Sequence, residues 1–430
     1  LVIGAGPSGL AAALAAATAG ASVVVTDENA RGGGSGLYNL GGASGIEART
    51  RTLLEAVAAH PRISLRTGTV AAGYYADHWV PLVDARRMTK MRARAVVVAT
   101  GAFEQPAVFR NNDLPGVMLG SAAQRLLYRH ALKPGDRAVV VAANSDAYRV
   151  ALDLHAHGVM IAAVVDLRDG EPSPLEQQAT RHGIEILTRH GVVEAIGRDH
   201  VKGVRVAALD GDGQPAGAAQ VYGCDLLLMS VGWAPAAAAL YQAGAKMHYD
   251  ERVHQFVPAH LPAGVFACGR VNGVHAFDAR LADGERAGRA AARYLGFAAD
   301  AAPAATAEPL VEPSPPSHPY PIFAHPRGKN FVDFDEDLQL KDFHHAAQEG
   351  FDNIELLKRY TTVGMGPSQG KHSNMNAIRI LARILGKPIA EVGTTTARPF
   401  FHPVAMSHLA GRGFQVERVT PLHERHVSSH

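Results

Sequence analysis

The chain has 430 residues, of which 47% are hydrophobic and 19% charged, and its net charge at pH 7 is +2. Because a single core rarely grows beyond about 250 to 300 residues, this length predicts two or three domains. The balanced charge gives no electrostatic footprint for nucleic acid, and no apolar run approaches the roughly 18 residues of a membrane-spanning helix, so we expect neither nucleic acid nor a membrane as a partner.

The cysteine content and the two ends of the chain lead to two further expectations. Cys224 and Cys268 are the only cysteines and lie far apart, which excludes a disulfide framework or a CxxC pair within this chain and favours a reducing cytoplasm. The sequence opens at Leu1 inside an expected strand, without an initiating Met or a charged signal region. We therefore expect a fragment, with further sequence before Leu1 and after His430.

The clearest motif stands at the very start of the chain. The runs LVI, GAGPSG and LAAALAAATAG follow one another from Leu1, in the order strand, glycine turn and helix. Gly4 permits the tight turn, Gly6 lets the backbone approach a pyrophosphate, and Gly9 allows close packing of helix on strand. The N-terminus of the expected helix offers free N–H groups to phosphates. The motif predicts a dinucleotide site; a glycine-rich turn that binds nothing is the alternative.

The next strand, expected over residues 22–25, ends at an acidic pair. Asp27 and Glu28 lie about 20 residues beyond the glycines, where a carboxylate can accept a hydrogen bond from an adenosine ribose. This spacing favours NAD or FAD over NADP. Pro7 in the turn and the later run from Gly32 to Ser35 are more typical of FAD-binding chains than of simple dehydrogenases.

Two later segments complete the first nucleotide unit. The run RAVVVATG, residues 94–101, predicts a buried strand that enters a turn at Thr100 and Gly101. The run GVFACGR, residues 264–270, resembles the last cofactor motif of two-dinucleotide-domain flavoproteins, which normally carries Gly-Asp where this chain has Gly269 and Arg270. This departure counts against an ordinary flavin site. Arg270 either meets a phosphate directly or is a surface charge.

From Leu1 to residue 297, β-branched runs alternate with Ala-rich amphipathic stretches, which is typical of βαβ units on a largely parallel sheet. A second, nested nucleotide unit is expected at about 130–230, beginning with the strand at 138–141. There the glycine turn is replaced by the run AANSDA, in which side chains and Asp146 would crowd an anion. We expect this second unit to have a structural role only.

No side chain of the chain is predicted to be catalytic or to bind a metal. Cys268 lies in an apolar strand, so a buried inert thiol is expected there, and the same is expected of Cys224. The 22 histidines show neither an HExxH motif nor any paired ligand spacing.

The C-terminal part begins with a change in composition. Residues 298–320 are rich in Ala and Pro and predict an extended linker. Beyond it, residues 321–395 predict a small, mostly helical module, with helices expected at 340–348, 354–360 and 375–385. The run KRYTTVGMGPSQGK, which ends at Lys371, is either a phosphate-binding loop or a tight connection between helices.

Long runs of the sequence resemble the alpha-subunit family of bacterial heterotetrameric sarcosine oxidases. The runs that carry the likeness are ATGAFEQPAVFRNNDLPGVML from Ala99, NSDAYRVALDL from Asn144 and KRYTTVGMGPSQGKHSN from Lys358. The resemblance implies an α/β, FAD/NAD(P)-binding, Rossmann-like fold with two dinucleotide domains over residues 1–297. Residues 396–430 would be the start of a folate-binding aminomethyltransferase-like domain, whose opening resembles the run TPLH at 420–423.

The tail also resembles the iron-sulfur module of related amine and cyanide-forming dehydrogenases, in which four cysteines hold a [2Fe-2S] cluster. The equivalent positions here are Val332, Phe334, Ser368 and Ser373. Because none of them is a thiolate, this chain is expected to carry no cluster.

The family likeness also implies cofactors and partners. The chain of alpha type would hold NAD, with FAD as the alternative, and would cover an FMN shared with a beta subunit, in a complex with gamma and delta subunits. Amine oxidation would occur on the beta subunit, with electrons passing to FMN and then to oxygen. An FAD-dependent enzyme in its own right, a component of an opine or proline dehydrogenase, and a scaffold that binds nothing are the alternatives.

The candidate cofactor-binding residues are taken from these motifs, with Lys371 and Arg359 as candidate contacts to the FMN phosphate. The full set for the cofactors is Gly4, Gly6, Pro7, Ser8, Gly9, Asp27, Glu28, Gly34, Ser35, Val70, Thr100, Gly101, Gly269, Arg270 and Lys371.

Overall fold

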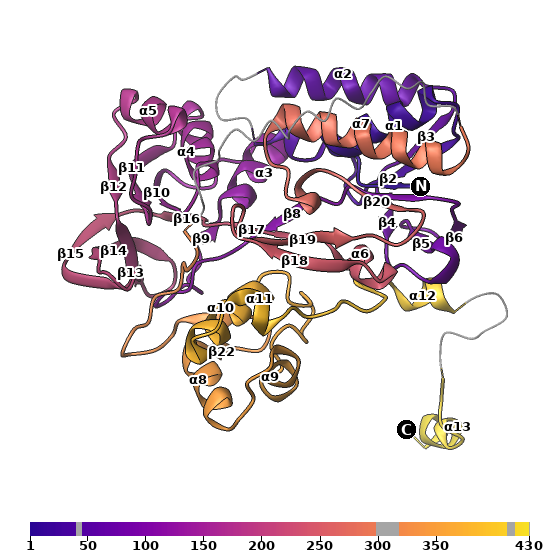
Figure 1. The fold of residues 1–430 in the computed structure, drawn as a ribbon. Helices are drawn as coiled ribbons and strands as arrows, with labels where there is room; N and C mark the ends of the chain where they lie inside the picture. Colours follow the sequence, from indigo (N-terminus) through magenta and orange to yellow (C-terminus); the bar gives the residue numbers. More distant parts are fainter. Residues whose placement is uncertain (40–44, 298–317, 411–417, 430) are drawn as a thin grey trace.

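The computed structural model describes residues 1–39, 45–297, 318–410 and 418–429. The predicted α/β class with largely parallel sheets is confirmed. Two five-stranded parallel sheets form the framework, with smaller antiparallel sheets and a helical C-terminal module packed around them (Figure 1). The predicted linker at 298–320 falls, up to residue 317, outside the described residues, as does the part of the predicted last domain at 411–417 and 430.

The first parallel sheet has the order β20-β7-β1-β2-β3. Its strands are β1 (Val2–Ile3), β2 (Val23–Thr26), β3 (Ile63–Arg66), β7 (Val96–Val98) and β20 (Val265–Ala267). Helices α1 (Pro7–Thr18), α2 (Ile46–Ala59) and α7 (Phe277–Tyr294) lie together along this sheet (Figure 1). The parallel order brings the carboxyl ends of β1, β2 and β7 to one edge, which is where ligands bind in such sheets.

Small residues let α1 and α7 pack closely. A Cβ added to Gly284 would lie 2.2 Å from the Ser8 carbonyl oxygen, and one added to Gly288 would lie 2.2 Å from that of Ala12. The Ala-rich face of α1 therefore meets α7 almost backbone to backbone. This contact places α7, and the arginines it carries, beside the glycine turn that precedes α1.

The second parallel sheet has the order β12-β11-β10-β16-β9. It consists of β9 (Val117–Leu119), β10 (Arg137–Ala142), β11 (Met160–Asp166), β12 (Ile186–Thr188) and β16 (Leu226–Ser230), with helices α3 (Gly120–His130), α4 (Asp146–Ala156) and α5 (Pro174–Arg181). The unit expected at about 130–230 thus also takes in β9 and α3, because β9 pairs with β16. Residues 138–143 are wholly buried, as a parallel sheet covered on both faces requires.

The antiparallel parts connect and cover the two units. They are β4 (Val70–Ala71), β5 (Trp79–Val83) and β6 (Met88–Arg92); β13 (His190–Gly197), β14 (Val201–Leu209) and β15 (Pro215–Gly223); and the pairs β8 (Ala102–Glu104) with β17 (Trp233–Pro235) and β18 (Lys246–Asp250) with β19 (Gln255–His260). The short helix α6 (Ala238–Ala243) follows β17.

The C-terminal module lies below these sheets in Figure 1. It comprises β21 (Phe331–Asp333), β22 (Leu338–Gln339), α8 (Leu340–Gln348), α9 (Ile354–Thr361), α10 (Asn374–Leu385) and α11 (Ile389–Val392), and α12 (Met406–Leu409) and α13 (His423–Ser428) follow. The three helices predicted in this region are confirmed to within one residue. No helix in the described part of the chain is long and apolar enough to cross a bilayer.

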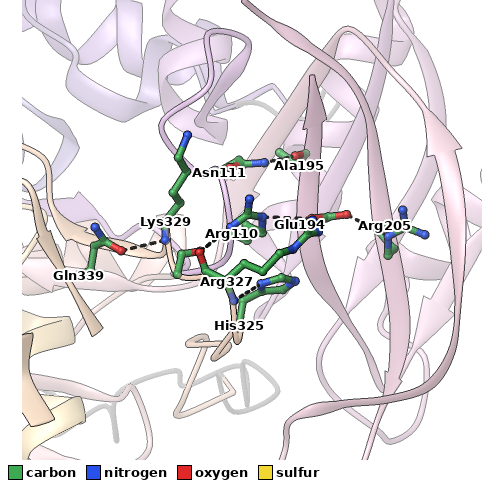
Figure 2. A network of polar contacts seen from close by, with 10 residues as sticks. Arg110, Asn111, Glu194, Ala195, Arg205, His325, Arg327, Lys329 and Gln339 are labelled. Carbon is green, nitrogen blue, oxygen red and sulfur yellow. Dashed lines mark hydrogen bonds and ion pairs between the residues drawn. The ribbon is translucent and has the colours of Figure 1, made fainter. Parts of the chain in front are cut away.

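One buried carboxylate ties the start of this module to the β13–β14 hairpin. Glu194, whose side chain is 11% exposed, forms ion pairs with Arg110 at 3.3 Å, Arg205 at 3.1 Å and Arg327 at 3.2 Å (Figure 2). Arg110 also donates to the carbonyl oxygens of Arg327 and Gly328. Three guanidinium groups around one carboxylate anchor the segment that leads into β21.

Candidate functional site

A cleft of about 190 Å³ opens at the carboxyl edge of the first sheet. It brings together most of the residues predicted from the sequence: Gly4, Gly6, Pro7, Ser8, Asp27, Glu28, Gly34, Ser35, Val70, Thr100, Gly101 and Arg270. Gly9, Gly269 and Lys371 belong to the predicted set but do not line it. We call this the first cleft.

The three glycines of the turn have different roles. Gly4 has φ +104° and a Cβ there would lie 2.4 Å from the Ala99 carbonyl oxygen, so only glycine fits. A Cβ on Gly9 would lie 1.9 Å from the Gly4 carbonyl oxygen. At Gly6, in contrast, an added Cβ would meet no heavy atom within 4 Å. Gly4 and Gly9 are required by packing, whereas Gly6 borders open space.

The start of α1 is suited to an anion. The N-cap of this helix of 12 residues is Gly6, which has no side chain to cap it, so the N–H groups that follow Pro7 in the first turn can face a ligand. Gly269 lies beside this turn: a Cβ there would be 2.3 Å from Ser8 Oγ. Gly269 therefore packs directly against Ser8 at the start of α1, where a larger residue would not fit.

The two acidic residues that follow β2, Asp27 and Glu28, have different roles. The Asp27 carboxylate accepts hydrogen bonds from Ala5 N at 2.7 Å and, through its other oxygen, from Asn29 N at 2.9 Å and Asn29 Nδ2 at 2.8 Å. Asp27 thus holds the glycine turn in place. The Glu28 side chain is 51% exposed, lines the same cleft and lies 3.8 Å from His402 Nε2, and burial lowers the pKa of His402. Glu28 is the carboxylate with free acceptor capacity.

Several cations line the first cleft that the sequence motifs did not reveal. Arg280 on α7 is 6% exposed and donates to Ser35 Oγ at 2.8 Å, and burial lowers the pKa of Arg280 to about 9. Arg125 and Arg129 on α3 each lie 5.1 Å from the Tyr38 ring centroid. They escaped sequence reasoning because they belong to ordinary amphipathic helices, distant from any cofactor motif.

Arg270 joins the two nucleotide units. Its Nη2 lies 3.7 Å from Asp146 Oδ2, and its guanidinium lies 4.4 Å from the Trp233 ring centroid. Trp233 Nε1 donates to the same Asp146 oxygen at 2.8 Å. Because Arg270 is only 6% exposed, its interpretation as a surface charge is wrong.

Charges around this pair shift the pKa values of two groups. Burial alone would raise the pKa of Asp146, but Arg270 and Arg149 outweigh it and hold that pKa below its usual range. His275 is partly buried beside the same pair, and desolvation together with Arg270 lowers its pKa to about 4. At neutral pH Asp146 is therefore charged and His275 is neutral.

The residues present in the first cleft fit the diphosphate of a dinucleotide. Gly6 borders open space, α1 starts without a side-chain cap, and both Arg270 and Arg280 have a buried Nε that bonds to no described residue. Two buried guanidinium groups with unused donors beside a helix N-terminus are what an oxyanion requires.

The equivalent turn of the second unit is filled by protein. Asp146, at the first position of α4, is held by Trp233 and Arg270. His318 N donates to the Ala143 carbonyl oxygen at 2.8 Å, so the segment that leads into the C-terminal module crosses the end of β10. Asp146 is thus engaged by protein side chains at the start of α4.

The two cysteines are buried and free, as predicted. Desolvation raises the pKa of Cys224 to about 11 and also raises that of Cys268. Such thiols are protonated and unreactive at neutral pH. Among the described residues, no three His, Cys, Asp or Glu side chains are grouped as metal ligands.

The four positions that correspond to the cysteines of an iron-sulfur cluster lie in two segments, and aspartate side chains of the first segment accept hydrogen bonds from the backbone of the second. Asp333 Oδ2 accepts from Gly364 N at 2.8 Å, and Asp335 Oδ2 accepts from Ser368 N at 2.8 Å. Val332 and Ser373 are buried, and Phe334 is 45% exposed. Backbone-to-carboxylate bonds therefore hold the glycine loop 364–370 against the end of β21.

Lys371, at the end of that loop, lies next to the first cleft without lining it. Its Nζ is 4.5 Å from the ring centroid of Phe401, which does line the cleft. Desolvation lowers the pKa of Lys371. The lysine is half-buried at the junction of the loop and the segment that follows α11.

Comparison with known proteins places the chain in a family. A family model described as pyridine nucleotide-disulphide oxidoreductase matches residues 1–291, and one described as the sarcosine oxidase A3 domain matches residues 327–412. Solved structures share the fold: L-proline dehydrogenase from P. horikoshii has a TM-score of 0.76 at 22% identity, covering 95% of this chain and 78% of that one. Lactococcus lactis thioredoxin reductase has a TM-score of 0.54 at 15% identity, covering 69% of this chain and 98% of that one.

Curated relatives agree. The sarcosine oxidase alpha subunit of Corynebacterium sp. (strain P-1) is 34% identical, with 100% of this chain and 47% of that protein covered. The protein of the same name from Rhizobium meliloti (strain 1021) is 33% identical, with 99% and 44% covered. An opine oxidase subunit from Agrobacterium tumefaciens (strain Ach5) is 27% identical, with 95% and 91% covered. The chain spans less than half the length of these sarcosine oxidase relatives.

The resemblance predicted from the sequence is therefore confirmed at the level of the family. The first unit, the second unit and the C-terminal module all overlap the matched regions. The chain belongs to the pyridine nucleotide-disulphide oxidoreductase family of FAD/NAD(P)-binding proteins, and along its whole length it is a homologue of sarcosine oxidase alpha subunits.

Proposed function

We propose that this chain is the dinucleotide-binding subunit of a sarcosine-oxidase-like complex that oxidatively demethylates N-methylglycine to glycine and forms hydrogen peroxide. One observation carries the proposal. The turn of the first unit leaves Gly6 facing open space, whereas the turn of the second unit is filled by Asp146 and crossed by the His318 segment. A reductase that draws electrons from a second dinucleotide needs the second turn open.

The first cleft would hold NAD in this proposal, with FAD as the alternative. The diphosphate would meet Gly6, the start of α1 and the guanidinium of Arg280, and Glu28 would accept a hydrogen bond from the adenosine ribose. When bound, NAD supplies a nicotinamide that can exchange hydride, and FAD supplies a flavin. Arg270 stands where a flavin site normally carries Asp, and this favours NAD.

The proposed partners are beta, gamma and delta type subunits. The C–N bond of the substrate would be oxidised on the beta subunit, so this chain alone would show little activity and would carry no catalytic residue. An FMN would be shared between this chain and the beta subunit, with Lys371 and Arg359 near its phosphate. We also expect the module at 321–395 to contain no iron-sulfur cluster, and the two unpaired cysteines are compatible with a cytoplasmic complex.

An opine or proline dehydrogenase type of complex is the second candidate. The match to the opine oxidase subunit covers 91% of that protein, and the proline dehydrogenase fold superposes with a TM-score of 0.76. Assaying the native complex with N-methylglycine, L-proline and an opine separates the candidates. Turnover of N-methylglycine at the highest kcat/KM supports the first proposal, and a preference for either other amine overturns it.

The cofactor is tested on the purified chain by recording its absorption spectrum and identifying the released nucleotide by mass spectrometry. We expect colourless protein that releases stoichiometric NAD. A yellow protein that releases FAD would transfer the redox chemistry to this chain. Protein that neither contains nor takes up a dinucleotide would leave only a scaffold role.

A further inference from the structure

A second cleft of about 920 Å³ lies between the second sheet and the C-terminal module. Its floor is the carboxyl edge of β11 and β12, one wall is the turn between β14 and β15, and the other wall is α10. None of its lining residues lines the first cleft. The second cleft is therefore a separate site, built at the sheet edge where nucleotide units bind ligands.

Arg379 on α10 is a buried cation in the wall of this cleft. It is 2% exposed and lines the cleft. Its Nη1 donates to Asn376 Oδ1 at 3.2 Å, whereas its Nε has no partner among the described residues. No carboxylate of the described residues lies within 4.0 Å of its guanidinium nitrogens. An arginine buried without a carboxylate is costly to fold, because its charge is desolvated and left uncompensated.

Arg383, one helical turn further along α10, adds a second cation to the same wall. It is exposed, its guanidinium lies 4.1 Å from the Tyr320 ring centroid, and its Nη2 donates to the Asp212 carbonyl oxygen at 2.6 Å. The arginines of the floor are already paired, Arg168 with Asp166 at 2.7 Å and Arg189 with Asp169 at 3.8 Å. The free positive charge of the cleft is thus concentrated on α10.

Besides these two paired arginines, the floor of the cleft offers acceptors and hydroxyl groups. Asp169, Glu171 and Glu176 line it together with Ser173 and Thr188. Such a surface suits the hydroxyl or amino groups of a ligand and repels a second or third phosphate. A dinucleotide is also disfavoured, because the turn that would hold its diphosphate carries Asp146.

We propose that the second cleft binds a nucleoside monophosphate, with its phosphate on Arg379 and Arg383 and its ribose and base toward the acidic side. The volume of the second cleft, about 920 Å³, is many times that of a free phosphate or a small carboxylate. The anion is held by arginines of the C-terminal module instead of by a glycine turn. Binding would join α10 to the second sheet across the cleft.

Isothermal titration calorimetry of the full chain with AMP tests the proposal. Arg383 is exposed, so Arg383→Gln should fold normally, and we expect it to weaken AMP binding at least tenfold. Arg379→Gln should weaken it further, with folding checked by circular dichroism. Arg293→Gln, an exposed arginine outside both clefts, should bind AMP like the unmodified chain.

AMP could also enter the first cleft, and Glu28→Gln distinguishes the two. If AMP binding is retained in Glu28→Gln and lost in Arg383→Gln, the second cleft is the site whatever the first cleft holds. Binding that depends on Glu28 alone, or that survives both arginine substitutions, overturns the proposal. Inorganic phosphate is titrated alongside: if it binds as tightly as AMP, the site is for a free oxyanion and the nucleotide assignment is wrong.

Discussion

Arg270 Nη2 lies 3.7 Å from Asp146 Oδ2, and the two residues are the points where this chain departs from the two cofactor motifs of its fold. Arg270 stands where the last motif of the first unit normally has an Asp. Asp146 belongs to the run AANSDA, which stands where the second unit would be expected to have a glycine turn. Their side chains meet over Trp233, which bonds to Asp146 and lies against Arg270. The two departures from the motifs are thus linked in the structure. The Arg270 guanidinium and the Asp146 carboxylate compensate each other's charge.

Breaking this pair should destabilise the protein. Arg270→Gln leaves Asp146, whose side chain is only 20% exposed, without its main cation, so we expect the free energy of unfolding to fall by about 3 kcal/mol. Asp146→Asn should cost less, since Trp233 can still donate to the amide oxygen. A double-mutant cycle by urea denaturation measures the coupling; additive effects of the two substitutions would show that the pair does not interact.

Gly6 and Gly9 should separate binding from stability. A Cβ on Gly6 meets no protein atom, so Gly6→Ala should change the unfolding free energy by less than about 1 kcal/mol and still reduce the bound dinucleotide. Gly9→Ala, whose Cβ would lie 1.9 Å from the Gly4 carbonyl oxygen, should cost about 3 kcal/mol or more. Melting temperature and released nucleotide are measured on both variants. Full nucleotide content in Gly6→Ala would contradict our assignment of Gly6 to the diphosphate.

His275 should make the protein sensitive to acid. Its pKa is lowered to about 4 in the folded chain by burial and by Arg270, from 6.5 when unfolded, so the unfolded state binds the proton first as the pH falls. Stability is therefore lost between about pH 6.5 and pH 4, by about 3 kcal/mol from this group, and is not lost further below that range.

His275→Gln should flatten this decline, and His248→Gln, an exposed histidine, should leave it unchanged. His318, whose pKa burial also lowers to about 4, accounts for a similar part. Urea denaturation at about pH 7 and about pH 4.5 gives the difference for each variant. A decline as steep in His275→Gln as in the unmodified chain would show that His275 is not responsible.

The C-terminal module should not take up iron. Valine and phenylalanine cannot bind iron, and serine is a poor substitute for a thiolate. After anaerobic incubation with iron and sulfide, metal analysis of the repurified chain should give no stoichiometric iron. The combined variant Val332→Cys, Phe334→Cys, Ser368→Cys and Ser373→Cys should gain iron if these positions are equivalent to the ligands of related modules. Iron in the unmodified chain would contradict the prediction.

The local parts of the fold and of the first cleft could be predicted because their causes are local. Gly4, Gly6 and Gly9 act within one short turn, through a positive φ, an open side and a close packing distance. The helices of the C-terminal module are marked by their own apolar spacing and end residues. Neither the glycine turn nor these helices depend on a residue from a distant part of the chain.

The cations could not be predicted in this way. Arg280 reaches Ser35 only because α7 packs on α1 through Gly284 and Gly288. Likewise, Arg379 lines the second cleft only because the C-terminal module lies against the second sheet. In the sequence, both are ordinary arginines of amphipathic helices.

The sequence by itself determined the family, the α/β class and the glycine turn of the first cleft, because backbone conformation and hydrophobic period are properties of short segments. Only the tertiary structure decided that Asp27 supports the turn while Glu28 stays free, and that Arg270 is buried against Asp146. The physical reason is that the charge state and role of a side chain depend on its burial and partners. Those partners come from segments that are far apart in the chain.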